Sequence, residues 1–452
     1  MIQISNLLSF ASMLKSLGGV LLAIVILLAM VTIHEFGHYV AGKVLGFKIN
    51  EFAVGFGPAI FKKRSKKTGE LFALRVIPLG GYCAFDGEDE ASDEEENNQQ
   101  KIADSDGNEP FSEMQEEMQN SENDGGMSAL NVERTDENVE KNTEEEYPEP
   151  QGERFNNQAP WKRIIVLIAG ATMNYLLALL LIVCMFTFVG RSFYQAVLAP
   201  QTETITTSAT LETLDEALED AEENTDKNDG NTTETVGYLP LQTGDVVLKI
   251  DGQKMFLITD YIDALDGKKA GDAVEILVLR EGKEQTLEMK LFADADFANL
   301  SDVQTLLKVM GFEKGEGFSP TTMKLGFFQT IGDAFLYSIK IGGTVLRSLG
   351  ELLTGKLGMD AMGGPVTTIQ VTSEAAASGL GSFLNIASFI GVNLAVFNLL
   401  PIPALDGCKV VFCLIEWIRR KPVNRKVEAF IHFIGIIVLF GFAILVDLLK
   451  LF

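Results

Sequence analysis

The stretch VTIHEFGHYVAG, from Val31 to Gly42, places two histidines and a glutamate directly after an uncharged apolar run, Leu17–Ile33. A helix needs about 20 mostly apolar residues to cross ~30 Å of hydrocarbon, so this segment can enter a bilayer. Ionisable side chains are costly there, and those found in membrane helices are functional by default. The stretch therefore predicts a membrane helix that carries a site for chemistry.

Three further runs can cross or nearly cross a bilayer: Ile164–Gly190, Ala375–Leu405 and Ala429–Val446. The first run lacks a small-residue cleavage site before the charged motif, and more spans follow it, so we do not expect a removed signal peptide. The sequence therefore predicts a polytopic α-helical membrane protein with four transmembrane helices.

Lysines and arginines cluster beside particular span ends, and this bias sets the orientation of the chain. They follow the first run, precede the second and lie between the third and fourth, at Lys43, Lys48, Lys62, Lys63, Arg64, Lys66, Lys67, Lys162, Arg163, Arg419, Arg420, Lys421, Arg425 and Lys426. These flanks are expected to be cytoplasmic. Both termini and residues 191–374 are then extracytoplasmic in a multi-pass protein of the cell membrane.

The formal net charge of −25 is concentrated in two polar segments. Residues 86–150 contain 24 acidic side chains against three basic ones. Such a composition cannot bury enough apolar surface to fold, so we expect a disordered cytoplasmic insertion at 87–158. The run Glu203–Glu234 is expected to be a second flexible linker, although its stretch TLETLDEALEDAEE has the composition of a short helix. We expect the lipid bilayer, but no nucleic acid, among the partners.

The cytoplasmic segment 43–86 alternates apolar and polar residues around turn glycines and prolines, in INEFAVGFGPAIF and GELFALRVIPLGGYCAF. This alternation predicts short strands. Strand backbone is tolerated at membrane depth only where it lines a protein cavity. We therefore expect a membrane-associated β-hairpin or small sheet that dips toward the bilayer.

The extracytoplasmic segment 236–295 predicts a strand, an Asp-Gly turn, a second strand, a short helix and a hairpin that turns at Glu281-Gly282. This order favours one PDZ-like α+β domain, in which an extended peptide adds to a sheet edge. Residues 321–357 have apolar groups at helical spacing, interleaved with charges. We expect an amphipathic helix at the outer membrane surface there, rather than a fifth span.

His34, Glu35 and His38 form the pattern HExxH. On a helix, residues i and i+4 are neighbours, so both imidazoles can point at one metal ion. Two imidazoles suit Zn²⁺, and Glu35 can reach a water at an open position of the ion. Chance placement is disfavoured, because two of the chain's three histidines form the pattern inside an apolar segment.

A third ligand is predicted from the third span, which ends in NLLPIPALDG. Asp406 is the first charged residue after 31 uncharged ones. Pro401 and Pro403 break the helix, so the backbone that follows can turn a carboxylate inward. Both motifs lie at the cytoplasmic ends of their spans and are therefore expected at the same depth.

Together, HEFGH, GFGP, RVIPLGGY, the PDZ-like segment and NLLPIPALDG resemble the site-2 protease family of intramembrane zinc metalloproteases. Within that family, the chain is similar to the bacterial regulator-of-sigma type with one PDZ domain. The resemblance implies Zn²⁺ as the cofactor. It implies His34, His38 and Asp406 as metal ligands and Glu35 as the catalytic base.

The resemblance also implies residues that position the substrate. Asn398 matches an asparagine that lies near the active site in the family. Gly80 and Gly81 lie in a loop thought to clamp the substrate as an added strand.

The chain departs from the family pattern in several places. In GATMN, Asn174 is retained but Ala171 replaces the family's proline, and Cys408 stands where a second glycine is usual. No peptide-binding residues are assigned in the PDZ-like segment, because its loop sequence is reduced. His432 has no partner at metal-ligand spacing and is expected to serve helix packing.

The expected segments follow one another along the chain. They are 1–42 (first span with HExxH), 43–86 (β-loop region), 87–158 (acidic insertion), 159–190 (second span), 191–235 (acidic linker), 236–295 (PDZ-like domain), 296–374 (linker with amphipathic helix), 375–410 (third span with LDG), 411–428 (cytoplasmic loop) and 429–452 (fourth span).

We expect a zinc endopeptidase that cuts single-pass membrane proteins, such as anti-sigma factors or signal-peptide remnants, within or near the bilayer after a prior site-1 cut. Its active site would face the cytoplasm. The alternative is a catalytically silent membrane scaffold that binds partners through its PDZ-like domain. A transporter would require an inverted repeat, and we see none in the sequence.

Overall fold

The computed structural model describes residues 2–88, 147–198, 239–292, 300, 302–358 and 362–450. The chain divides into two compact units, one of Met1–Leu180 with Ser348–Phe452 and one of Leu181–Arg347. Most of the predicted acidic insertion, and the acidic run with its short helix, lie outside the described residues.

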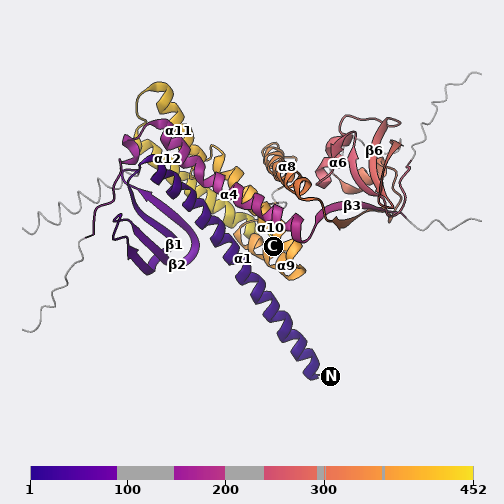
Figure 1. Ribbon diagram of the computed structural model, residues 1–452, viewed down its shortest axis with the longest axis horizontal. Coiled ribbons are helices and arrows are strands. Elements are labelled where there is room, and N and C mark those ends of the chain that lie inside the picture. The colour runs from indigo at the N-terminus through magenta and orange to yellow at the C-terminus, as the bar shows by residue number, and fades with distance from the viewer. Residues whose placement is uncertain are drawn as a thin grey trace, which may run out of the picture. The chain divides into compact units, whose positions relative to one another are not determined.

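Among the described residues, four helices are long and apolar enough to cross a membrane, in agreement with the sequence (Figure 1). They are α1 (Ile2–Leu45, with Leu17–Leu45 as its apolar part), α4 (Pro160–Phe188), α10 (Leu380–Leu399) and α12 (Arg425–Leu449). Two further helices of the first unit are α9 (Pro365–Ser378) and α11 (Asp406–Arg419).

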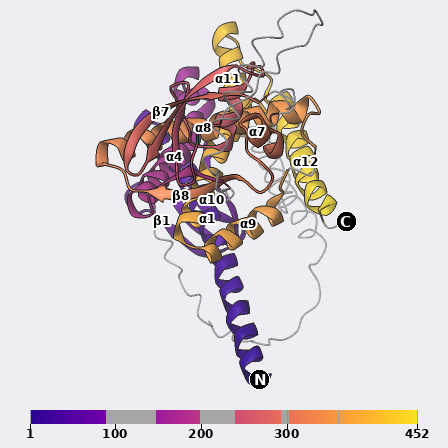
Figure 2. The same cartoon turned by 90° about the vertical axis from the view of Figure 1, so that its right-hand side faces the viewer.

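The third apolar run is not one continuous helix: its first four residues, 375–378, end α9, and the span α10 follows. α9 ends and α10 begins around Gly379, whose φ of +131° is poorly accessible to other residues. α9 packs beside α1 (Figure 2), where a β-carbon on Gly19 would lie 2.6 Å from Ser373 Oγ. Hydropathy misses the break because both sides of it are uncharged. α10 then ends at Leu399, before the two prolines, as the sequence predicts.

The predicted strands of the first unit are present as β1 (Ile49–Arg64) and β2 (Leu71–Phe85). Their register shows a long hairpin that folds back on itself. Ala53 pairs with both Tyr82 and Ala73, so the first half of β1 lies between two parts of β2.

Glycines with positive φ allow this hairpin to bend, at Gly55 (φ +85°), Gly57 (φ +82°) and Gly80 (φ +113°). Around the bend, several apolar side chains are exposed, namely Phe56, Ile60, Phe61, Val76 and Ile77. In a membrane protein, such an exposed apolar bend suits contact with lipid or substrate rather than with water.

The last part of the predicted insertion is ordered. Residues 147–158 return to the first unit, where the 3-10 helix η1 (Phe155–Asn157) begins. Phe155 is buried and packs against Phe47 and Phe85, with ring centroids 5.4 and 5.5 Å apart. The acidic composition of the insertion predicts disorder up to residue 158 and gives no sign that Phe155 packs against the first unit.

The second unit contains one antiparallel sheet with the order β7-β6-β4-β3-β8, and β5 pairs with β4. Its elements are β3 (Arg191–Val197), β4 (Val246–Ile250), β5 (Gln253–Lys254), α6 (Ile258–Leu265), β6 (Ala273–Arg280), β7 (Lys283–Lys290), α7 (Val303–Val309) and β8 (Gly317–Met323). Buried Tyr261 and Leu265 of α6 pack on one face of the sheet, against Val247, Ile276 and their neighbours.

The two hairpin turns of this unit confirm the sequence prediction. Asp251 and Gly252 have φ of +45° and +77°, and Glu281 and Gly282 have +50° and +76°. Positive φ at both central residues is the turn geometry that matches the twist of paired strands.

The sheet is larger than the predicted segment 236–295, because β3 and β8 extend it on one side. β3 follows a membrane helix after only two residues, Val189 and Gly190, and lies outside the segment in which strands were predicted. β8 contains Pro320, which disfavours a strand in sequence reasoning but is tolerated at the sheet edge, where β8 lies.

The predicted amphipathic helix is α8 (Phe327–Leu353), and its charged residues face the protein. Asp333 accepts hydrogen bonds from Arg191 at 2.7 Å and from Lys254 at 2.6 Å. Lys340 binds Asp260 at 2.6 Å, and Arg347 binds Asp263.

The three charged positions on α8 are seven residues apart and therefore share one side of the helix. The other side exposes apolar groups, among them Phe328 (87% exposed), Phe335 (49%) and Ile339 (51%). α8 is thus tied to the second unit by ion pairs, and its apolar side is left outward.

Asp333→Asn should destabilise the second unit. The Asp333 side chain is 1% exposed, and Arg191 is 4% exposed, so the change leaves a buried guanidinium without its counter-charge, at a cost of about 3–5 kcal/mol. We expect a lower thermal unfolding temperature of the purified full-length protein. The matched change Asp263→Asn breaks an exposed pair, at a cost of ~0.2–1 kcal/mol. Equal unfolding temperatures for the two variants would contradict this assignment.

Candidate metal centre

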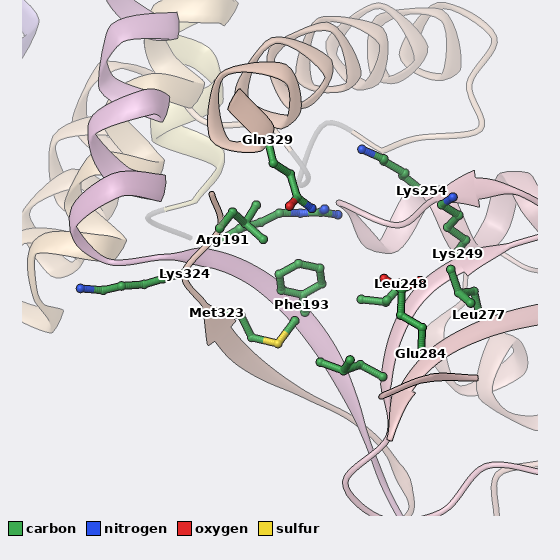
Figure 3. Close-up of a pocket in the computed structure, with 12 residues that line it drawn as sticks. Arg191, Phe193, Leu248, Lys249, Lys254, Leu277, Glu284, Met323, Lys324 and Gln329 are labelled. Carbon is green, nitrogen blue, oxygen red and sulfur yellow. The ribbon is translucent and has the colours of Figure 1, made fainter. Parts of the chain in front are cut away.

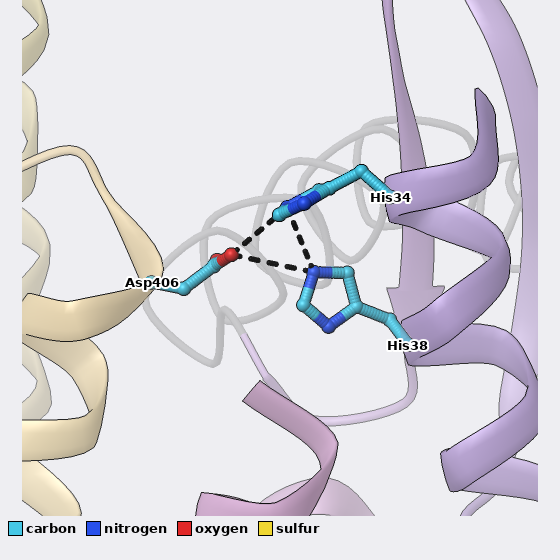
Figure 4. Close-up of side chains that lie close together, drawn as sticks. All are labelled: His34, His38 and Asp406. Carbon is cyan, nitrogen blue, oxygen red and sulfur yellow. Dashed lines mark hydrogen bonds and ion pairs between the residues drawn. The ribbon is translucent and has the colours of Figure 1, made fainter. Parts of the chain in front are cut away.

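His34 and His38 lie one turn apart on α1, and both imidazoles are largely buried, with 8% and 7% exposure. Their rings meet edge to face with centroids 4.7 Å apart. Buried imidazoles side by side are unfavourable unless they share a partner, since each has a polar nitrogen to satisfy. Figure 4 shows that both rings turn toward the same point.

Asp406, the first residue of α11, reaches this point from a distant part of the chain (Figure 4). Its Oδ2 lies 3.0 Å from His34 Nε2 and 3.4 Å from His38 Nε2. The two Nε2 atoms are 3.1 Å apart. All three donor groups, which the sequence singled out, therefore converge.

These separations fit a zinc ion. Zinc bonds of ~2.0–2.2 Å to nitrogen and oxygen give a tetrahedron with edges of roughly 3.3–3.6 Å. The three donor pairs, at 3.0, 3.1 and 3.4 Å, lie at or slightly inside that edge. Among the described residues, this is the one group of three or more His, Cys, Asp or Glu side chains that could hold a metal ion.

A backbone carbonyl of α4 fixes the orientation of His38. His38 Nδ1 lies 2.8 Å from the carbonyl oxygen of Val166, which can only accept a hydrogen bond. Nδ1 therefore carries the proton, and Nε2 is left with a free lone pair toward the cluster. This arrangement is typical of histidines that bind metals.

Two amides flank His34 on its other side. Asn174 of α4 and Asn398 of α10 each lie 3.4 Å from its Nδ1. Asn174 is 1% exposed, and its Oδ1 has no hydrogen-bond partner. Rotating this amide by half a turn would direct Oδ1 at His34 Nδ1 and would fix the tautomer that frees Nε2.

Two glycines allow α1 and α4 to approach closely enough for these contacts. A β-carbon on Gly37 would lie 2.4 Å from the carbonyl oxygen of Ala169. A β-carbon on Gly170 would lie 2.3 Å from His38 Nε2 and 2.8 Å from His34 Cε1. Sequence reasoning noted GATMN only for its retained Asn174 and its missing proline, and it missed that Gly170 provides space for the cluster.

A third glycine brings the end of α10 to the start of α11. A β-carbon on Gly407 would lie 2.3 Å from the carbonyl oxygen of Leu400 and 2.5 Å from that of Leu399. The residue after Asp406 must therefore be glycine for the carboxylate to stand where it does. The next residue, Cys408, is buried, with 7% exposure.

The predicted base and the β-loop also meet. A β-carbon on Gly81 would lie 3.3 Å from Glu35 Cγ and 3.7 Å from Val31 Cγ1. At Gly80, it would lie 2.0 Å from the Phe56 ring. The strand that contains both glycines thus passes directly beside the glutamate of the HExxH pattern.

The second unit contains a cavity of about 370 Å³ with different chemistry (Figure 3). Apolar side chains such as Phe193, Leu248 and Leu277 line it, and Lys249 and Lys324 lie at its border. Its lining has no histidine or cysteine and one carboxylate, so it is not suited to hold a metal ion.

Comparisons with known proteins agree with this chemistry. The model of peptidase family M50 matches residues 22–442. The zinc metalloprotease RasP of Bacillus licheniformis is 28% identical, over 93% of this chain and 95% of the relative. The regulator of sigma-W protease RasP of Bacillus subtilis is 26% identical, over 91% and 93%. A putative zinc metalloprotease of Staphylococcus aureus is 29% identical, over 94% and 95%.

A solved PDZ domain of an SdrC-like protein from Listeria monocytogenes is 27% identical where it aligns. It covers 14% of this chain and 79% of its own, with a TM-score of 0.12. At that TM-score, the superposition carries no argument about the fold.

Gly170→Ala should weaken metal binding although residue 170 offers no ligand atom. The added methyl group would displace His38 Nε2, and we expect at least a tenfold loss of zinc affinity, as for other residues that orient ligands. The check is the zinc content of the purified protein after dialysis against a weak chelator. Gly441→Ala is the matched control, because nothing lies within 4 Å of its β-carbon position. Unchanged zinc content in Gly170→Ala would contradict the placement of α4 against the cluster.

Proposed function

This chain belongs to peptidase family M50, and we propose that it cuts single-pass membrane proteins within the bilayer, after an earlier cut has shortened them outside it. Membership confirms the resemblance to site-2 proteases, and the chain is an intramembrane zinc metalloprotease. The observation that carries the proposal is the convergence of three donor atoms from α1 and α11.

In this proposal, His34, His38 and Asp406 hold the zinc ion. Zinc bound there would supply Lewis-acid activation of a water molecule and of the scissile carbonyl. Support comes from donor separations close to a tetrahedral edge and from the Val166 carbonyl, which leaves His38 Nε2 available. Both imidazoles are almost completely buried.

Glu35 is the proposed general base. Its carboxylate takes a proton from the attacking water and returns it to the leaving amide nitrogen, so that water and peptide give a carboxylic acid and an amine. It follows His34 on α1, and its Cγ lies beside the strand that contains Gly81.

Gly80, Gly81 and Asn398 are the proposed substrate-positioning residues. The membrane helix of a substrate must unwind, because helical hydrogen bonds shield its carbonyl groups. An unwound segment can add to the edge of β2, and glycines without side chains let it come close to Glu35. Asn398, half-buried beside His34, can hydrogen-bond the backbone of that segment.

The second unit is the proposed PDZ-like module that excludes intact ectodomains, and we place it on the extracytoplasmic side. α8 would lie at the outer membrane surface with its apolar side toward lipid. Tyr337 of α8 contacts Phe186, in the last turn of the span α4, with ring centroids 5.5 Å apart. This contact supports a position of α8 where α4 leaves the bilayer. The active site would then face the cytoplasm.

The proposed substrates are anti-sigma factors or signal-peptide remnants. Support comes from the relative in Bacillus subtilis whose name is regulator of sigma-W protease, and which aligns over 91% of this chain. The recognition chemistry would be that of a short, trimmed stub attached to one membrane helix.

Glu35→Gln should abolish cleavage while zinc stays bound. The amide keeps the size of the side chain but cannot accept the proton, and loss of a general base costs about 10²–10⁴-fold in rate. Cleavage of a fluorescent single-pass substrate in liposomes and zinc content should be measured on the same preparation. His38→Ala, as the comparison, should lose both. Turnover by Glu35→Gln equal to that of the parent would exclude the proposed base.

Gly81→Ala should impair substrate use more than metal binding. The new methyl group would lie 2.8 Å from the Ala53 carbonyl oxygen and 3.3 Å from Glu35 Cγ, so it would disturb the part of β2 that lies beside the proposed base. We expect a reduction of kcat/KM of roughly tenfold or more, since small misplacements near reacting atoms are costly. Zinc content should match that of the parent. Unchanged kcat/KM would argue against strand addition at this edge.

A further inference from the structure

The segment 400–405 links α10 to Asp406 and has two prolines, so only four of its residues have an N–H group. Three of these donate to carbonyl groups of residues 397, 400 and 402. The fourth belongs to Ala404, and it donates to Nδ1 of His432 at 3.1 Å. The Ala404 N–H is thus bound by a side chain of another helix, α12, whereas the other three N–H groups are bound by backbone carbonyls close by in sequence.

Ala404 also has an unusual backbone conformation, with φ of +81°. Among the described residues, three other non-glycine residues have positive φ: Asp251 and Glu281 in hairpin turns and Arg420 at the end of α11. A residue with a β-carbon is strained at positive φ, and it keeps this backbone conformation only where the surrounding structure holds it. At Ala404, the strain lies two residues from Asp406.

α12 braces the same loop with a second contact. A β-carbon on Gly435, one turn after His432, would lie 2.4 Å from Pro403 Cβ and 2.6 Å from its carbonyl carbon. His432 also packs against the ring of Phe412 in α11, with centroids 6.0 Å apart. One side of α12 therefore contacts both the loop and the helix that begins with Asp406.

We propose that His432 is a positioning residue: by accepting the Ala404 N–H, it holds the strained loop in the conformation that presents the Asp406 carboxylate to His34 and His38. The inference rests on the proposed role of Asp406 as a zinc ligand. It replaces the expectation from sequence that His432 only packs between helices.

The side chain at position 432 can be varied to separate packing from hydrogen bonding. Asparagine places its Oδ1 as many bonds from the backbone as histidine places Nδ1, so His432→Asn keeps an acceptor for Ala404. Leucine has the shape of asparagine without the acceptor. Glutamine is as polar as asparagine, but its carbonyl oxygen stands one bond farther out and overshoots Ala404 N–H.

The test measures zinc affinity of the full-length protein in detergent, by competition with a chromophoric chelator, for the parent and the three variants. Loss of an orienting partner typically weakens metal binding 10–100-fold, so we expect His432→Leu and His432→Gln to fall by at least about tenfold. His432→Asn should stay within about threefold of the parent. The absorption spectrum of the Co²⁺-loaded protein should change in the same two variants, because it reports ligand geometry.

A second change tests the strain directly. Glycine adopts positive φ freely, so Ala404→Gly in the His432→Leu background should recover most of the lost affinity. Phe433→Leu, at a 61% exposed neighbouring position, controls for substitution in this helix and should leave affinity unchanged.

Each outcome decides between the accounts. Parental affinity in His432→Leu, or an equal loss in His432→Asn and His432→Leu, would overturn the positioning role. If His432→Leu fails to accumulate, the comparison of His432→Asn with His432→Gln decides in the same way. A parent protein that binds no zinc would instead refute the proposed function.

Discussion

Three donor atoms placed within 3.0–3.4 Å of one another inside a bundle of apolar helices form the constraint on which the first unit depends. Two imidazoles and a carboxylate are costly to remove from water unless they share a partner. That cost explains the surrounding architecture. α1 and α4 must approach each other at glycines. α10 must end at Leu399, before the two prolines, and α11 must begin with the Asp406 side chain turned toward the histidines.

The cluster is surrounded largely by backbone groups and by glycines, which have no side chain. Val166 contributes a carbonyl oxygen, Gly170 contributes space, and Gly407 allows two helix ends to meet. Backbone carbonyl groups and close helix contacts cannot be recognised as a sequence motif. They explain why a metal site in a membrane can be built from few polar side chains. The groups that orient the ligands belong to the helix backbone, so no further polar side chain has to be buried.

The sequence identified the donor residues because their pattern is local or topological. His34 and His38 follow from helical spacing, and Asp406 follows from its depth at the end of an uncharged run after two prolines. The four spans and both hairpin turns were likewise predictable from hydropathy and from positive-φ residues.

What the sequence did not yield are relations between distant segments. The break at Gly379 is invisible to hydropathy, since both sides are uncharged, and β8 contains a proline that argues against a strand. The contact of His432 with Ala404 joins two helices through a backbone N–H, which no single-sequence pattern reports. α8 was predicted as amphipathic, but only the structure reveals that its charges face the protein and its apolar side faces outward.

The central claim is that His34, His38 and Asp406 hold one zinc ion. X-ray absorption at the zinc edge of the purified protein tests it most directly, because it reports the ligand atoms themselves. The account predicts one zinc per chain, bound by nitrogen and oxygen at ~2.0–2.2 Å, with two imidazoles and no sulfur. It also predicts that Asp406→Ala lowers the zinc content or changes the set of atoms bound to the ion. Sulfur at ~2.3 Å, which would bring in a cysteine such as Cys83 or Cys408, or an unaltered zinc content and spectrum in Asp406→Ala, would contradict it.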